Sequence, residues 1–355
     1  DPATMLGKGK LNDLNLLAFQ TGAELVIFDQ ELTPTQARNL ADRMELRVVD
    51  RTQLILDIFA QHANTGDGKL QVELAQLRHL SPRLVRGWSH LERQKGGIGL
   101  RGPGETQLET DRRLVRHRIA MLKRRLEEGR KRRSLSRQQR LRNEVPTVSL
   151  VGYTNAGKST LFNRLTGAEV LAKDMLFATL DPTMRRVQLP DGPEVILSDT
   201  VGFVSDLPTE LVAAFRATLE EVTNADLILH VRDIANPASA AQKTQVLEVL
   251  RGLGVVSGGE EGDEPVSSIP MLEVWNKWDL LAEDAREDLA ARAEEDETVV
   301  PLSAETGFNI DVLEARIAQA LTREAIIREI VLPASAGREI AWLHAHGHVL
   351  EEVEI

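Results

Sequence analysis

The chain has 355 residues, and its 42% hydrophobic and 27% charged content is typical of a globular protein. This length predicts two or three domains. The absence of cysteine excludes disulfides, thiolate zinc sites, iron–sulfur clusters and a cysteine nucleophile. No apolar stretch is as long as a membrane span and no signal peptide is visible, so we expect a cytoplasmic protein without a membrane anchor. Because the chain begins with Asp1, we also expect a segment to precede it.

The net charge of −11 is divided unevenly along the chain. Residues 1–146 carry 27 Lys and Arg against 18 Asp and Glu, a net charge of +9, whereas residues 147–355 carry 16 against 36, a net charge of −20. This asymmetry predicts a part that binds a polyanion, joined to an acidic module.

Residues 1–68 predict a small α/β subdomain. Residues 24–28 and 46–49 are short β-like runs. Between them, Thr33 suits the N-cap of a helix and Pro34 suits its first turn.

A long antiparallel helical hairpin is predicted over residues 69–143. Apolar residues at alternating spacings of four and three form a stripe in each half. These residues are Leu70, Leu74, Leu77, Leu84, Trp88 and Leu91 in the first half, and Val115, Ile119, Leu122 and Leu126 in the second. The glycine-rich residues 96–104 are expected to form the tip loop between the two helices.

From residue 144 to 322 the pattern alternates between strand and helix, which predicts an α/β domain with a mostly parallel sheet and helices on both faces. The expected strands are 147–151, 195–197, 226–231, 271–275 and 298–302. The expected helices are 208–221, 238–253, 284–294 and 310–321. Residues 257–268 are expected to form a mobile surface loop. Residues 323–355 are expected to form a small α+β tail domain.

A phosphate-binding loop of the form G-x-x-x-x-G-K-[ST] follows the first of these strands. Its residues are Gly152, Tyr153, Thr154, Asn155, Ala156, Gly157, Lys158 and Ser159, and the next residue, Thr160, is a further predicted nucleotide contact. Backbone N–H groups of such a loop surround phosphate oxygens, and the following helix adds positive potential. We expect Lys158 to neutralise the β- and γ-phosphates in catalysis, and Ser159 to be a Mg²⁺ ligand. The strand before the loop and the helix after it disfavour a chance glycine turn.

A D-x-x-G motif comprises Asp199, Thr200, Val201 and Gly202. Its aspartate can hold Mg²⁺ through a water molecule, and the amide of Gly202 can reach a γ-phosphate and sense its presence. This motif alone is usually a turn, but its place at a strand end after the phosphate loop favours the functional interpretation.

A guanine-binding motif is predicted at Asn276, Lys277, Trp278 and Asp279. A carboxylate at Asp279 accepts from both N1 and N2 of guanine, whereas adenine would leave it unpaired. The amide of Asn276 serves the acceptor edge of the base. Ser303 and Ala304 follow the next strand, where a backbone N–H could read O6. Taken alone the motif would be a capping turn, but in this order the loops predict a site for GTP and GDP.

The order of these motifs resembles that of the translation-factor-related GTPases, in which a threonine of the first switch coordinates Mg²⁺. Here Thr179 is the candidate, Thr183 is the reserve, and Phe177 and Ala178 are expected nucleotide contacts. Residues 96–101, followed by GPGETQLETDRR at 102–113, resemble the signature of the HflX family of ribosome-associated GTPases. The resemblance covers nearly the whole chain. It implies a cytoplasmic GTPase that binds the large (50S) ribosomal subunit and helps to split stalled or stressed ribosomes.

Two residues of the nucleotide loops have two interpretations each. Phe203 stands where Ras-type enzymes carry a water-positioning glutamine, so we expect slow hydrolysis that a partner stimulates. Alternatively, Phe203 only packs against the sheet, and both can hold. Asn155 resembles the residue that holds K⁺ in cation-activated GTPases. The alternative is a turn asparagine that tolerates an unusual backbone angle.

The hairpin is the predicted RNA-binding part, because residues 112–142 carry 14 Lys and Arg against two acidic residues. Few aromatic residues accompany them, which favours reading of RNA by its backbone and shape. A solvated helix face is the alternative. With weight from the family resemblance, the glycine loop is expected to enter a narrow RNA-lined cavity rather than act as a flexible linker. The predicted contacts are Gly96, Gly97, Gly99, Arg101, Gly102, Gly104, Arg112, Arg113, Arg116, Lys123, Arg124, Arg130, Lys131, Arg132 and Arg133.

These observations predict a monomeric, Mg²⁺-dependent GTPase that docks on the large ribosomal subunit with GTP and leaves after hydrolysis. Two alternatives remain open. One is a constitutive RNA-binding or ribosome-assembly protein with a structural nucleotide site, and the other is a GTPase that regulates a membrane process. His344, His346 and His348 alternate near the end of the chain, where a polar surface is favoured over a metal site.

Overall fold

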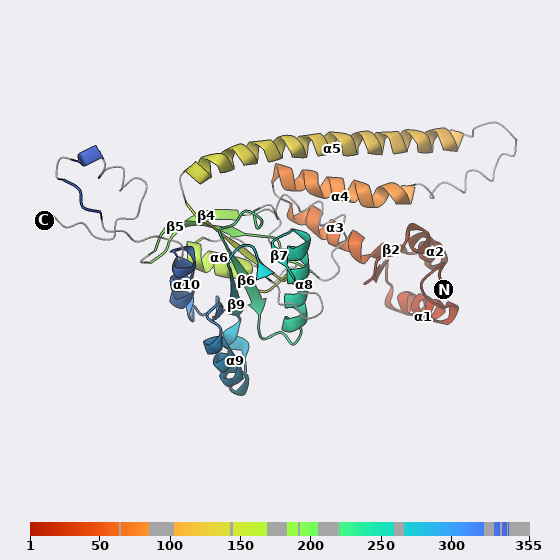
Figure 1. Ribbon diagram of the computed structural model, residues 1–355. Helices are drawn as coiled ribbons and strands as arrows, with labels where there is room; N and C mark the ends of the chain where they lie inside the picture. The colour runs from red at the N-terminus through yellow and green to blue at the C-terminus, as the bar shows by residue number, and fades with distance from the viewer. Residues whose placement is uncertain are drawn as a thin grey trace.

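The computed structural model describes residues 1–63, 65–84, 103–142, 145–168, 183–190, 192–204, 219, 221–258, 266–322, 330–333, 336–338 and 340. Figure 1 shows a domain with a central sheet, a smaller N-terminal unit beside it, and stacked helices that link the two. No helix within the described ranges is long and apolar enough to cross a membrane.

The N-terminal unit has the α/β character that the sequence predicts. Its elements are α1 (Lys8–Thr21), β1 (Leu25–Phe28), α2 (Pro34–Met44), β2 (Arg47–Asp50) and α3 (Arg51–His62). Strands β1 and β2 pair in parallel, because α2 connects them as a crossover. Thr33 caps α2, where its hydroxyl accepts from the amide of Gln36, and the side chain of Gln36 accepts from the amide of Thr33. The prediction of a helix start at Thr33 and Pro34 is confirmed.

The hairpin consists of α4 (Gly66–Leu84) and α5 (Pro103–Arg142), which pack side by side (Figure 1). They run antiparallel, because Arg118 of α5 forms an ion pair of 2.6 Å with Glu73 of α4, while Gly129, farther along α5, lies against Asp67, nearer the start of α4. Leu122 on the predicted stripe of α5 is fully buried. One detail differs from the prediction. Helix α5 begins at Pro103, so Gly104 belongs to the helix and not to the tip loop, and proline is favoured at a first helical position because its φ angle is preset.

Helix α4 buries a second face that its apolar stripe does not reveal. Val72 and Ala75 are buried in a core that α4 shares with α3, so α4 lies between α3 and α5. Helix α4 is also fixed to the N-terminal unit by Asp50, whose buried carboxylate caps α3 at the amide of Gln53 (2.8 Å) and pairs with Arg83 of α4.

The central sheet has six strands in the order β10-β9-β6-β3-β5-β4, and every pairing is parallel except that of β4 with β5. The strands are β3 (Thr147–Gly152), β4 (Thr183–Gln188), β5 (Glu194–Asp199), β6 (Leu227–Asp233), β9 (Met271–Asn276) and β10 (Val299–Pro301). The predicted mostly parallel sheet is confirmed. The edge strand β4 was not predicted, because Arg185 and Arg186 interrupt its apolar pattern.

Helices cover both faces of this sheet. Helices α6 (Lys158–Thr166) and α10 (Ile310–Thr322) bury side chains on one face, and α8 (Ser239–Gly252) does so on the other. Helix α9 (Glu283–Glu295) packs beside β10, and the short helix η2 (Trp278–Leu280) follows β9. The two ends of the predicted mobile loop 257–268 lie at paired strands, since β7 (Val256–Ser257) is antiparallel to β8 (Val266–Ser267).

The α8 face of the sheet shares one core with the N-terminal helices, which we call the α3–sheet core. It joins residues of α3 and α4 to residues of the sheet, the nucleotide loops and α8. Its buried members are Ile55, Leu56, Phe59, Ala63, Val72, Ala75, Val151, Val201, Phe203, Leu219, Val222, Ala225, Ile228, Val246, Leu250, Val255 and Val256.

Several predictions fall outside the described residues. They concern most of the helix at 208–221, the greater part of the tail 323–355, the tip glycines before Pro103, Arg101, the histidines after residue 340, and the switch residues Phe177, Ala178 and Thr179. The side chains of Arg130, Arg132 and Arg133 are outside the description as well.

Candidate functional site

The phosphate loop connects β3 to α6, as predicted, and places Lys158 at the first position of the helix. The side chain of Lys158 is buried, and its ammonium group donates to the carbonyls of Gly152 (3.2 Å) and Tyr153 (2.9 Å). Burial lowers the pKa of Lys158 to about 8, against the opposing attraction of Asp199. The loop therefore presents a cation whose charge costs energy until an anion compensates it.

The backbone of the loop explains two of its residue types. Gly157 has a φ of +92°, and a Cβ there would lie 2.1 Å from Nδ2 of Asn276, so this position requires glycine. Asn155 also has a left-handed backbone, with a φ of +59°, which agrees with the turn-asparagine interpretation. The role of Asn155 toward K⁺ stays a prediction.

The two predicted Mg²⁺-site residues of the described chain meet directly. The hydroxyl of Ser159 donates to Oδ2 of Asp199 over 2.8 Å, and Asp199 is fully buried at the end of β5. Thr183, the reserve candidate, begins β4 and is the register partner of Asp199. Hydroxyl and carboxylate oxygens are the donors that Mg²⁺ prefers, so this set fits the ion. In the described part of the chain, no three His, Asp or Glu side chains group into a metal site of their own.

The D-x-x-G loop is hydrogen-bonded to the phosphate loop through Phe203. Its amide donates to the carbonyl of Gly152 (3.1 Å), and its carbonyl accepts from the amide of Thr154 (2.7 Å). A Cβ at Gly202 would lie 2.7 Å from Cα of Thr154, so only glycine allows this close approach. The hydroxyl of Thr200 donates to the carbonyl of Leu150 over 2.6 Å and fixes the start of the loop. The side chain of Phe203 is 1% exposed and packs in the α3–sheet core, in agreement with the packing interpretation.

Asn276 links two loops within the protein. Its Nδ2 donates to the carbonyl of Ala156 (2.8 Å), and its Oδ1 accepts from the amide of Ala304 (3.0 Å). The sequence predicted that the Asn276 amide serves the acceptor edge of the base and that a backbone N–H at Ser303 or Ala304 could read O6. In this structure the Ala304 N–H donates to the Asn276 side chain. The reason is that β9 and β10 are neighbours, which places their carboxyl ends side by side.

The other residues of the predicted base site lie around this link. Asp279 lies in η2 and is partly exposed, and its carbonyl accepts from Arg286. Lys277 pairs with Asp233 over 2.7 Å. Ser303 is buried, and its hydroxyl accepts from the amide of Thr306. The structure thus brings the predicted residues of the described chain to one edge of the sheet.

Sequence reasoning missed two residues of this site. Asp233 is the last residue of β6, at the same edge of the sheet. The sequence signal that could have indicated it was its position at the carboxyl end of a parallel strand. Arg164 of α6 donates through Nε to the carbonyl of Ala304 (3.1 Å) and through Nη2 to that of Glu305. Nothing in the sequence indicated Arg164, because its partners are about 140 residues away.

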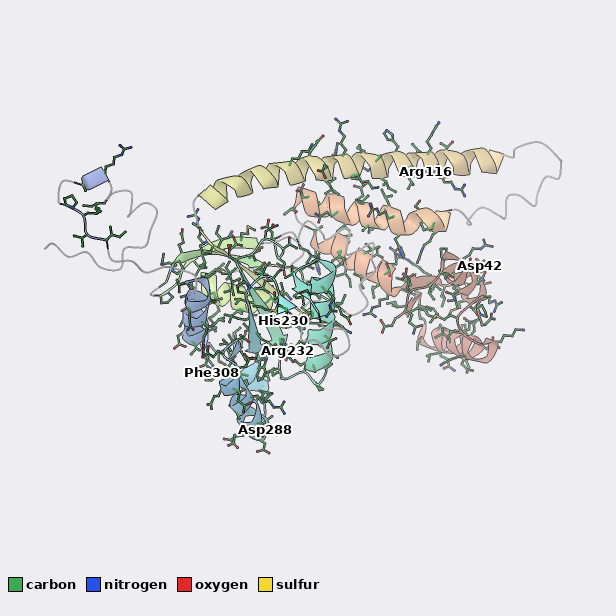
Figure 2. The ribbon with its side chains drawn as sticks, in the orientation of Figure 1. Asp42, Arg116, His230, Arg232, Asp288 and Phe308 are labelled. Atoms are coloured by element: carbon green, nitrogen blue, oxygen red, sulfur yellow. The ribbon has the colours of Figure 1, made fainter. Side chains whose placement is uncertain are left out.

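The candidate RNA surface is the side of α5 that faces away from α4. Arg113, Arg116, Lys123, Arg124 and Lys131 have exposed side chains, and Arg112 is half-buried. In Figure 2, Arg116 lies on α5, far from Asp288 on α9. Arg124 pairs with Glu128 at 3.3 Å on the surface, which offsets little of the positive charge.

Comparisons with known proteins cover the whole chain. Family models described as "GTP-binding GTPase N-terminal", "GTP-binding GTPase Middle Region" and "50S ribosome-binding GTPase" match residues 1–60, 62–140 and 147–276, respectively. The GTPase HflX of Escherichia coli (strain K12) is 50% identical over 100% of this chain and 83% of its own length. The GTPase HflX of Magnetococcus marinus is 48% identical over 99% of this chain and 78% of its own length. The solved structure of the SsGBP and GDP complex is 26% identical, with a TM-score of 0.51 over 92% of this chain and 89% of that chain. On the strength of the sequence matches, which run from one end of the chain to the other, the protein is a P-loop GTPase and belongs to the HflX family.

Proposed function

We propose that this GTPase docks on the large (50S) ribosomal subunit in the cytoplasm through the basic face of α5, and that it promotes the splitting or rescue of stalled ribosomes. Bound GTP controls docking, and hydrolysis controls release. The observation that carries the proposal is one continuous assembly of the nucleotide loops with the α3–α4–α5 layer. Family membership supports the ribosome as the partner, because one matching family model is described as a 50S ribosome-binding GTPase.

The nucleotide part of the proposal rests on the loop geometry. The triphosphate of GTP lies along the phosphate loop with Lys158 on its β- and γ-oxygens, and Asp279 accepts from the guanine base. A similar protein has been solved as a complex with GDP, which supports a guanine nucleotide as the ligand. Ser159 and Asp199 would hold Mg²⁺, which supplies charge neutralisation between the phosphates. The amide of Gly202 senses the γ-phosphate, because its loop is hydrogen-bonded to the phosphate loop.

The RNA part of the proposal rests on the exposed cations of α5. Arg113, Arg116 and Lys123 project from a helix whose opposite side packs on α4. A rigid row of cations binds phosphates by counterion release and does not require a base sequence. The rRNA of the large subunit is therefore the expected surface.

Slow hydrolysis in the free protein follows from the burial of Phe203. Its side chain points into the α3–sheet core and has no polar atom with which to orient a water molecule. The missing group therefore comes from the docked subunit, which predicts strong stimulation by 50S particles.

The test is GTP hydrolysis with and without 50S subunits, with separation of 70S ribosomes followed in the same samples. We expect stimulation of at least tenfold and splitting that requires GTP. The variant Lys158→Ala should lose both, while it keeps its fold by circular dichroism. Equal ribosome affinity with GTP, with GDP and without nucleotide would overturn the switch and support a constitutive RNA-binding protein. Nucleotide-dependent binding to lipid vesicles, with none to 50S subunits, would instead support a GTPase of a membrane process.

A further inference from the structure

We propose that Phe203 is a positioning residue that couples the D-x-x-G loop to helices α3 and α4, so that the nucleotide state sets the orientation of the α4–α5 hairpin. This inference rests on the proposed function, because it assigns the route by which GTP controls docking. Phe203 touches no part of the nucleotide in this assignment and acts through the groups around it.

The backbone of Phe203 belongs to the nucleotide site. Its amide and carbonyl form two hydrogen bonds with the phosphate loop, at Gly152 and Thr154. Gly202 comes immediately before it, and a Cβ at Gly202 would lie 2.7 Å from Cα of Thr154 and 3.1 Å from Nζ of Lys158, so this glycine is adjacent to both residues. A shift of Gly202 toward a γ-phosphate therefore moves Phe203 as well, since the two residues share a peptide bond.

The side chain of Phe203 lies in a core that the N-terminal helices share with the sheet. The α3–sheet core places it in one packed cluster with Leu56 and Phe59 of α3 and with Val72 of α4. Tyr153 of the phosphate loop also packs against this core. Packed cores have discrete arrangements and do not deform smoothly, so a displaced Phe203 repositions the helices around it.

Helices α3 and α4 transmit such a shift to the RNA surface. Asp50 fastens them to each other, because its carboxylate caps α3 and pairs with Arg83 of α4. Helix α4 in turn packs along α5 and pairs with it through Glu73 and Arg118. Coupling is reciprocal, so a ribosome that holds α5 in the GTP-type orientation must also stabilise the GTP-type position of Gly202.

A distance measurement tests this coupling directly. The chain has no cysteine, so cysteines introduced at the exposed positions His117 of α5 and Asp288 of α9 can carry a donor–acceptor dye pair. Figure 2 shows Arg116, next to His117, and Asp288 far apart on the two parts of the molecule. We expect energy transfer in the full chain to differ between a non-hydrolysable GTP analogue and GDP.

Matched variants separate coupling from loss of stability. Leu56→Ala alters the α3–sheet core, whereas Leu40→Ala makes the same change in the separate core of the N-terminal unit, and both leucines are buried. Leu56→Ala should abolish the nucleotide-dependent change in energy transfer and reduce 50S-stimulated hydrolysis at least fivefold, with GDP affinity unchanged. Leu40→Ala should leave all three readouts as in the parent. If Leu56→Ala does not fold, Phe59→Leu keeps an apolar side chain in the same core and should weaken the change in energy transfer.

The possible results distinguish the coupling from the proposed function. A parent protein that binds both nucleotides and is stimulated by 50S subunits, but shows no change in energy transfer, overturns the coupling and leaves the proposed function intact. The same holds if the folded Leu56→Ala or Phe59→Leu variant behaves like Leu40→Ala. Failure of the parent to bind 50S subunits overturns the proposed function itself.

Discussion

The ammonium group of Lys158 donates a hydrogen bond to the carbonyl of Tyr153 over 2.9 Å, so the phosphate loop binds its own lysine before it binds a phosphate. Desolvation lowers the pKa of this buried lysine to about 8, although Asp199 opposes the shift. The affinity of the site is therefore linked to the protonation of one residue.

Nucleotide affinity should depend on pH above about 8. A bound phosphate raises the pKa of Lys158 again, so GDP binds best when the lysine is already charged, below pH 8. As the pH rises above 8, binding must take up a proton, and affinity falls by up to about tenfold per pH unit. Titration with a fluorescent GDP analogue between pH 6.5 and 9.5 measures this. In Lys158→Arg, which stays charged throughout, the slope should disappear, and an unchanged slope would assign the titration to another group.

Variants of Asn276 and Asp279 should have distinct effects, the first on the stability of the protein and the second on recognition of the base. Asn276→Ala leaves the carbonyl of Ala156 and the amide of Ala304 without their partner, which should lower the free energy of unfolding by about 2–4 kcal/mol even without nucleotide. Asp279→Asn should change that free energy by less than about 0.5 kcal/mol, because the side chain is partly exposed. It should move the preference from guanine to xanthine, since an amide N–H can donate to the 2-oxo group. Urea unfolding and competition between GTP and XTP check the two effects, and equal stability of both variants would contradict the link through Asn276.

Asp50 should contribute far more to the free energy of unfolding than the surface ion pair of the hairpin between Glu73 and Arg118. Its side chain is fully buried against Arg83, so Asp50→Asn should cost about 3–5 kcal/mol of unfolding free energy. The pair of Glu73 with Arg118 is substantially exposed, and Glu73→Gln should cost less than about 1 kcal/mol. Urea unfolding of the two variants under identical conditions measures both. The expectation is wrong if Glu73→Gln is the more damaging change.

The cations of α5 should set the salt dependence of ribosome binding. Replacing Arg113, Arg116 and Lys123 by glutamate should weaken 50S binding at least tenfold and lower the slope of log affinity against log salt by roughly 0.7–0.9 for each phosphate that the helix no longer neutralises. The control reverses three exposed arginines elsewhere, namely Arg43, Arg185 and Arg292. Pelleting assays at several salt concentrations compare the two triple variants. An equal reduction in both would point to net charge and not to the α5 surface.

Local signals in the sequence were sufficient for much of the fold and for placing the predicted site residues of the described chain at the ends of strands. Near neighbours in the sequence determine the cap at Thr33. Simple periodicity indicates the buried stripe residue Leu122 and the strands that end at Asp199 and Asn276. These features depend on short-range geometry, which a sequence displays directly.

Features that depend on tertiary packing could not be predicted in the same way. The second buried face of α4 at Val72 follows from contact with α3, and one apolar stripe shows only one partner. The link from Asn276 to Ala304 joins residues 28 apart, and that from Arg83 to Asp50 joins residues 33 apart. The side chain of Asn276 is of a type that suits guanine. Nothing in the sequence shows that its amide also forms hydrogen bonds within the protein, with Ala156 and Ala304.

The length of α5 has a mechanical consequence. Its 40 helical residues span about 60 Å in one unbroken rod. Such a rod acts as a lever arm, and a tilt of only about 5° at its base sweeps its far end through about 5 Å, the pitch of one helical turn. A tilt too small to disturb the packing around α4 would thus displace Pro103 by about the pitch of one helical turn, which in the proposed function is the scale on which the helix would engage or leave an RNA groove.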